Sequence, residues 1–151
     1  GQVSVDYRGV DGPYGNFGAL ERYIGNQQIT DLAVRRYREA GRDFQEADGS
    51  PESLAQAAAA GDEIATAVWN EVAMLLGTAL VSVVYLLNPD AIVIGGGVAH
   101  AGDVLFAPLR ERMRSMLSFE FYESLKILPA ELGNSAGIVG GAALAVSAHS
   151  R

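Results

Sequence analysis

The fold class of this chain is decided by the stretch Leu87-Asn88-Pro89-Asp90-Ala91-Ile92-Val93-Ile94-Gly95-Gly96-Gly97-Val98. Asn88 precedes a proline, which disfavours the α region and predicts the end of a helix. Ala91–Ile94 is a short, wholly apolar strand, and such a strand is typical of a sheet covered on both faces. The glycines Gly95–Gly97 let backbone approach a ligand closely at the carboxyl end of that strand. The stretch therefore favours an α/β fold; from the residues alone the turn is a tight turn without a ligand, and contact with a nucleotide or phosphate is the alternative.

Helices are predicted on both sides of this strand. A long helix, Asp62–Leu87, carries apolar residues at helical spacing. Its most apolar part, Ala73–Leu87, is interrupted by glycine, threonine and serine, so we interpret it as a buried core helix and not a membrane span. A helix over about Ala101–Leu117 then precedes a second strand, Lys126–Leu128, which we expect to pair in parallel with the first. The last helix, Ala136–Ala148, is rich in glycine and alanine, which predicts close packing.

The first third of the chain combines a glycine-rich loop with short helices. The loop Gly9–Gly18 holds four glycines and a proline, so several positions in it favour positive φ. Thr30-Asp31 is predicted to cap a helix over Ala33–Ala40. Ser50 is predicted to cap a helix over Glu52–Ala60, because a proline and a carboxylate follow it directly.

Composition limits the classes of function that the chain can have. It has 151 residues, of which 49% are apolar and 19% charged, so it is predicted to fold as one domain with a sizeable core. The formal net charge of −7 makes this segment a poor candidate for direct contact with nucleic acid. The absence of cysteine excludes disulfides and thiolate metal sites, and it fits a reducing, cytoplasmic setting. We expect no membrane association.

Segments at both ends of the chain carry a family resemblance. The N-terminal one is Gly1-Gln2 followed by Gly12-Pro13-Tyr14-Gly15-Asn16-Phe17-Gly18-Ala19-Leu20-Glu21. The C-terminal one is Pro129-Ala130-Glu131-Leu132-Gly133-Asn134-Ser135-Ala136-Gly137-Ile138-Val139-Gly140-Gly141-Ala142. Together with the strand and its glycines, these segments resemble the ROK (repressor, ORF, kinase) family, in the right order along the chain. Gly15, Gly18 and Glu21 match the family signature outright.

The resemblance implies a fold, ligands and site residues. The chain resembles the C-terminal half of a ROK protein, which implies part of an actin-like (ribonuclease H-like) ATPase domain in a longer chain. By resemblance, Glu21 and Gln2 bind a hexose or related sugar, and Gly95–Gly97 lie along the adenosine of ATP, which is used with Mg²⁺. ROK proteins commonly form homodimers, so we expect one here. Without the resemblance, a carboxylate such as Glu21 at a helix start would only complement the helix dipole.

The departures from the family pattern are as informative as the matches. The signature includes one histidine and three cysteines that bind structural zinc, and those positions are Gln2, Gly12, Tyr14 and Ala19 here. Since none offers a thiolate or an imidazole, we expect no zinc. Packing of Tyr14 and Phe17 is one way to order the loop instead. The family's first phosphate loop and its catalytic aspartate do not occur in this sequence, so no catalytic residue is assigned and no metal ligand is expected.

Two functions from different classes stay open, with a third behind them. The main hypothesis is the C-terminal domain of a glucokinase-like sugar kinase, inactive in isolation. The alternative is the sugar-sensing domain of a ROK transcriptional repressor, in which an N-terminal helix-turn-helix domain binds the DNA. A degenerate interaction module without a ligand is the third. The residues that precede Gly1 in the parent chain would separate the first two.

Overall fold

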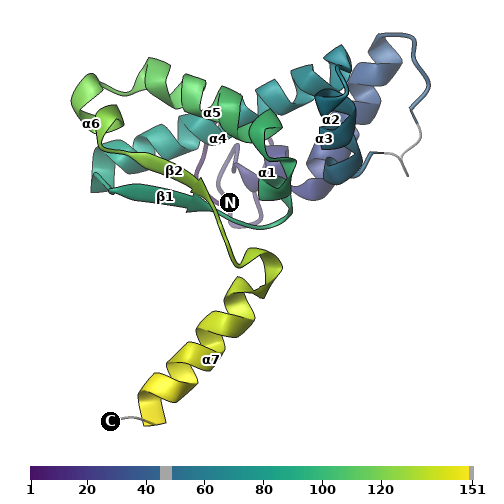
Figure 1. Cartoon of the computed structure of the whole chain (residues 1–151). Coiled ribbons are helices and arrows are strands. Elements are labelled where there is room, and N and C mark those ends of the chain that lie inside the picture. The colour runs from purple at the N-terminus through teal and green to yellow at the C-terminus, as the bar shows by residue number, and fades with distance from the viewer. Residues whose placement is uncertain (45–48, 150–151) are drawn as a thin grey trace.

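The structure is a computed structural model that describes residues 1–44 and 49–149. It is helix-rich, with a small parallel sheet (Figure 1). The elements in chain order are α1 Glu21–Ile24, α2 Asn26–Glu39, α3 Pro51–Ala59, α4 Glu63–Leu87, β1 Ala91–Ile94, η2 Gly97–Ala101, α5 Asp103–Met116, α6 Phe119–Glu123, β2 Lys126–Pro129, η3 Gly133–Ser135 and α7 Ala136–His149. In Figure 1, α4 and α5 run side by side above the sheet, and α7 extends away from the rest.

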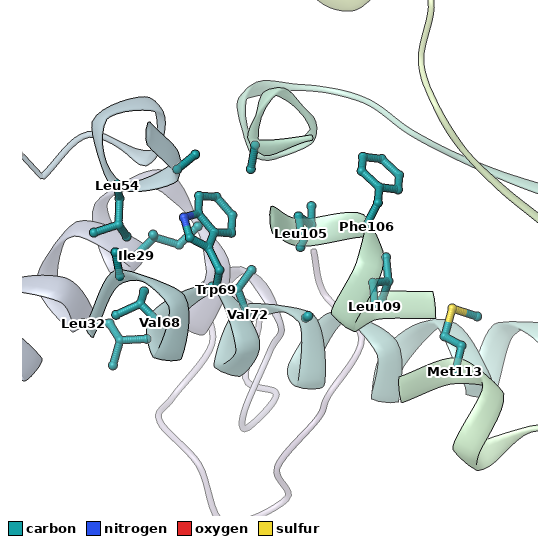
Figure 2. Close-up of a cluster of buried hydrophobic side chains, with 14 of the residues drawn as sticks. Ile29, Leu32, Leu54, Val68, Trp69, Val72, Leu105, Phe106, Leu109 and Met113 are labelled. Carbon is teal, nitrogen blue, oxygen red and sulfur yellow. The ribbon is translucent and has the colours of Figure 1, made fainter. Parts of the chain in front are cut away.

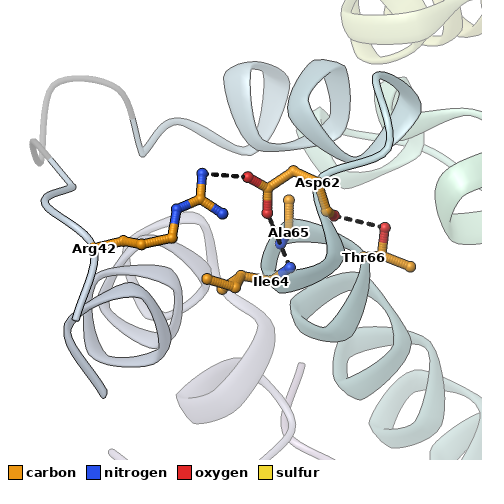
Figure 3. A network of polar contacts seen from close by, with 5 residues as sticks. All are labelled: Arg42, Asp62, Ile64, Ala65 and Thr66. Atoms are coloured by element: carbon orange, nitrogen blue, oxygen red, sulfur yellow. Dashed lines mark hydrogen bonds and ion pairs between the residues drawn. The ribbon is translucent and has the colours of Figure 1, made fainter. Parts of the chain in front are cut away.

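The long helix α4 begins and ends where the sequence predicts. Asp62 is its N-cap: the carboxylate Oδ1 accepts hydrogen bonds from the amides of Ile64 at 2.9 Å and Ala65 at 3.1 Å. Asp62 also pairs with Arg42 at 2.8 Å, which ties the helix start to the end of α2 (Figure 3). At the other end, Asn88 adopts a left-handed conformation with φ of 44° and closes the helix before Pro89.

The hydrophobic core is built around α4. Trp69 is completely buried at its centre, where side chains from α2, α3 and α5 converge (Figure 2). Leu54 from α3 and Leu105 from α5 are equally inaccessible. By length and composition α4 is also apolar enough to cross a membrane. Its buried face packs against α1, α2, α3 and α5, as the prediction of a core helix requires.

The two strands pair in parallel, as predicted. The register runs from Ala91 opposite Lys126 to Ile94 opposite Pro129. One face of the sheet contacts the core through Ile92, Ile94 and Ile127. On the other face, Val93 is 62% exposed and Leu128 43% exposed. The prediction of a sheet covered on both faces is therefore wrong for the described residues, because α4 and α5 cover a single side of it.

The last helix forms as predicted but does not pack as predicted. α7 has no buried residue, and Ile138 and Leu144 are among its exposed side chains. Figure 1 shows it leaving the body of the molecule after η3. The expected close packing of its small residues is therefore absent from the described part of the chain. A helix that is apolar all round is normally buried, and among residues 1–44 and 49–149 nothing covers α7 or the exposed face of the sheet.

Two capping predictions had different outcomes. Ser50 caps α3 and accepts a hydrogen bond from the amide of Ser53 at 3.1 Å, which confirms that prediction. The cap predicted at Thr30-Asp31 is wrong, because α2 already begins at Asn26, directly after the extended Gly25. The buried Thr30 hydroxyl instead lies 2.7 Å from the Gly49 carbonyl and anchors the approach to α3. The short helix α6 was not predicted, since five residues carry no periodic signal.

Candidate functional site

The N-terminal segment forms a short antiparallel ladder with the residues that lead into α1. The Val5 amide donates to the Gly18 carbonyl at 2.9 Å, and the Leu20 amide donates to the Val3 carbonyl at 2.9 Å. The Glu21 amide donates to the Gly1 carbonyl at 2.8 Å. Residues 1–5 and 18–21 are thereby held side by side. The two predicted sugar-binding residues, Gln2 and Glu21, therefore lie on paired segments.

Glu21 lies at the start of α1, where its carboxylate is exposed and close to the N-terminal strand. A Cβ added to Gly1 would lie 2.6 Å from Glu21 Oε2, so a side chain at position 1 would displace the carboxylate. Gln2, the next residue, is exposed as well. An exposed carboxylate and an exposed amide thus lie on the two paired segments, and each can bond hydroxyl groups.

Between the two strands of the ladder, the glycine loop is ordered by backbone contacts. Gly18 has φ of 61° and packs against the Asp6 carbonyl so closely that a Cβ does not fit. The Tyr23 hydroxyl accepts a hydrogen bond from the Val10 amide at 3.3 Å. Tyr14 is 81% exposed and Phe17 54% exposed, so the suggestion that these two rings order the loop by packing is wrong.

The positions that hold zinc in the resembled family do not fit a metal in this chain. Ala19 is completely buried, Gly12 has no side chain, and the Tyr14 phenol points to solvent. Gln2 offers a neutral amide where the family has an imidazole. Within residues 1–44 and 49–149, no group of three or more histidine, aspartate or glutamate side chains could hold a metal ion. The two histidines lie elsewhere: His100 is 3.7 Å from Glu52, and His149 contacts its own helix.

The second candidate site is the glycine turn after β1. Gly95, Gly96 and Gly97 are all exposed at the carboxyl end of the strand. Gly96 has φ of 81°, a conformation that favours glycine, and Gly97 begins η2. The turn is fixed from β2, since the Ala130 amide donates to the Ile94 carbonyl at 2.9 Å. Three exposed glycines beside a helical start leave backbone amides accessible to a ligand.

Asn26 connects the two candidate sites, and sequence reasoning missed it. Its side chain lies 3.4 Å from the point where a Cβ on Gly97 would stand. Asn26 is also the first residue of α2, five positions after Glu21. The segment 21–26 therefore reaches from the N-terminal ladder to the glycine turn. The only sequence signal for Asn26 is its place directly after Gly25, where a helix can begin. That signal was missed because the helix start was predicted at Thr30-Asp31 instead.

Comparison with known proteins identifies the family. The sequence pattern of the ROK family matches residues 1–148. The chain belongs to the ROK family. It is 30% identical over 155 residues to a glucokinase of Thermotoga maritima, covering 95% of this chain and 47% of the relative. It is also 30% identical over 147 residues to the transcriptional repressor Mlc of Escherichia coli, covering 95% of this chain and 36% of the relative.

Solved structures of ROK proteins agree with the fold. A ROK glucokinase from Streptomyces griseus, in complex with glucose and AMPPNP, superposes with a TM-score of 0.82 at 27% identity and covers 95% of this chain. A regulator homologous to Mlc superposes with a TM-score of 0.73 at 30% identity over 85% of this chain. The fold is thus a partial actin-like ATPase domain of mixed α/β type, as predicted. The chain spans 49% of the first of these structures and 33% of the second, so it is about half the length of a ROK kinase.

Proposed function

We propose that this chain is the C-terminal half of a ROK sugar kinase, which transfers the γ-phosphoryl group of ATP to a hexose hydroxyl. The observation that carries the proposal is the N-terminal ladder, which holds residues 1–5 alongside residues 18–21, the segments that contain Gln2 and Glu21. The matches to glucokinases from Thermotoga maritima and Streptomyces griseus support it. In this proposal the sugar lies at the ladder and the nucleotide at Gly95–Gly97.

In the sugar site, Glu21 accepts hydrogen bonds from two hydroxyl groups of the hexose. A carboxylate has two oxygens with about four acceptor positions, and bonds to a charged group are roughly twice as strong as neutral ones. Gln2 adds an amide that both donates and accepts, without charge. The backbone of Glu21 is held by the bond from its amide to the Gly1 carbonyl and by the short helix α1.

In the nucleotide site, the exposed backbone of Gly95–Gly97 lies along the adenosine part of ATP, with Asn26 beside Gly97 as a further hydrogen-bonding group. Mg²⁺ would neutralise the phosphates; in kinases it is held by them and by one or two carboxylates. Within the described residues, no group of three or more acidic or histidine side chains could hold a metal ion. The general base that accepts the hydroxyl proton is assigned to the other half of the protein. A coupled assay of ADP release by the 151-residue chain alone should therefore stay at background.

The second candidate is a sugar-sensing repressor, favoured by the match to Mlc. A repressor needs the sugar pocket but no phosphoryl transfer. Because this chain carries a net charge of −7, it would repel the DNA backbone, so in a repressor another domain would contact the DNA. For either function we propose a cytoplasmic protein that acts as a homodimer. Hexose binding without ATP-dependent phosphorylation by the full-length protein would decide for the repressor.

Glu21→Gln tests the sugar site. The change keeps the shape and one acceptor oxygen but removes the charge, and a hydrogen bond to a charged group contributes roughly 1.5–3 kcal/mol. Calorimetric titration of the full-length protein with a panel of hexoses should show affinity about tenfold lower or worse, since ~1.4 kcal/mol is one decade. The thermal midpoint without sugar should barely change.

Glu63→Gln is the matched control, because Glu63 is also an exposed carboxylate at the first position of a helix. If both variants lower the thermal midpoint slightly and neither changes sugar affinity, Glu21 only complements its helix dipole. That result would remove Glu21 from the sugar site.

A further inference from the structure

The loop that lacks zinc ligands has a polar cross-link that the sequence did not reveal. Asn16 Nδ2 donates to the Gln2 carbonyl at 3.0 Å, across the mouth of the loop. The Gly12 amide donates to the Asn16 carbonyl at 2.6 Å. Asn16 thus contacts positions 2 and 12, two of the four that carry metal ligands in the resembled family.

The Asn16 side chain also fills the space beside Gly12. A Cβ added to Gly12 would collide with Asn16 Oδ1, so any side chain at position 12 and the observed Asn16 conformation exclude each other. Oδ1 is buried and has no hydrogen-bond partner among the described residues. The orientation of the amide is nevertheless fixed, because exchanging its oxygen and nitrogen would set two acceptors against each other at Gln2.

We propose that Asn16 is the positioning residue of the sugar site: in place of a metal ion, its side chain links the backbone of Gln2 to the glycine loop. The inference rests on the proposed function for the identity of the ligand, but not for the link itself. The backbone ladder fixes residues 1, 3 and 5 on the side that faces positions 18–21. The Gln2 carbonyl points to the other side, where Asn16 is the bond that restrains it.

Asn16→Asp separates the link from the volume of the side chain. The aspartate has nearly the same shape, but it cannot donate to the Gln2 carbonyl when ionised and repels it. Asn70→Asp, an equivalent change at an exposed site on α4, is the control for added charge. Hydrogen exchange of the 151-residue chain should show the Leu20 and Glu21 amides about tenfold less protected in Asn16→Asp, the effect of losing roughly one hydrogen bond. The control should match the wild type.

Binding by the full-length protein gives the second measurement. In Asn16→Asp, hexose affinity should fall about tenfold while nucleotide affinity and the thermal midpoint of the core stay unchanged, a split that general destabilisation does not produce. Asn16→Ala should behave in the same way without the added charge. A chelator should leave the exchange rates of the wild type unaltered.

Two outcomes would overturn the proposal: exchange at Leu20 and Glu21 that is the same in Asn16→Asp and wild type, or loss of protection in the wild type on chelation. Failure of the proposed function has a different signature. If the wild type binds no hexose but Asn16→Asp still loosens the ladder, Asn16 remains the link and the sugar assignment is wrong.

Discussion

The core around Trp69 and the loop of residues 1–20 are stabilised in opposite ways. Trp69 is enclosed by apolar side chains from several helices, as are Leu54 and Leu105, and the geometry of any single contact matters little there. In the loop, order depends on individual hydrogen bonds, from the backbone and from side chains such as Asn16, and on glycines with no room for a side chain. Substitutions that remove side-chain volume should therefore destabilise the core most. The loop should be most sensitive to substitutions that break one hydrogen bond or add one clashing atom.

Trp69→Ala should have the largest effect on the core. Removing a fully buried tryptophan leaves a cavity, and such changes cost about 3–5 kcal/mol. Chemical denaturation of the chain measures the loss. Trp69→Phe should cost much less, because a ring is kept and an indole Nε1 that has no partner among the described residues is removed. Equal losses for both variants would contradict a core held by volume.

Gly18→Ala should have the largest effect on the loop. A residue with a side chain at φ of 61° costs about 1–2 kcal/mol, and here its Cβ would also collide with the Asp6 carbonyl. Gly15→Ala is the matched control, since Gly15 has φ of 77° but nothing within 4 Å of the added Cβ. Limited proteolysis should cut the loop faster in Gly18→Ala than in Gly15→Ala. Similar rates would mean that strain alone, and not the collision, limits the loop.

Asp62→Ala tests the point where polar contacts support the core (Figure 3). The change removes the N-cap of α4 and the ion pair with Arg42, and loss of a cap costs about 0.5–2 kcal/mol. Arg42→Ala removes only the ion pair, and Arg42 is 55% exposed, so its effect should be about 0–1 kcal/mol. Thermal denaturation of both variants measures the two contributions. An equal loss would place the stabilisation in the ion pair and not in the cap.

The smallest expected effect is a pH dependence that Asp62 gives to the core. Burial acts to raise the pKa of Asp62, but hydrogen bonds from Ala65, Tyr37, Arg42 and Ile64 outweigh it and hold the pKa below its usual value of 3.8. A lowered pKa in the folded state stabilises the fold above pH 3.8, and this contribution is lost as the pH falls through the folded-state pKa. Asp62→Asn should flatten the acid limb of the stability curve, and an unchanged limb would argue against the shift.

The sequence predicted the elements whose signals are local. Ser50, Asp62 and Asn88 lie within three residues of the helix ends that they define, so their roles can be read without a partner. The parallel pairing of β1 and β2 followed from the order of elements. Asn16 could not be predicted, because its partner Gln2 is 14 residues away and the bond exists only once the loop has closed. The exposure of α7 could not be predicted either. An apolar helix sequence indicates that the helix is buried, but it does not show which other segment it packs against.

The packing of α4 against α5 also bears on the order in which the molecule forms. The two helices make the most extensive contact between described elements, and only β1 and η2 separate them in the chain. Contacts between near neighbours in sequence form early, because little chain entropy is lost in closing them. Residues 51–116 should therefore collapse first, even during synthesis, before β2 has emerged from the ribosome. Pulse-labelled hydrogen exchange during refolding should protect α4 amides before those of β2, and the sheet would be the late product of a helical nucleus.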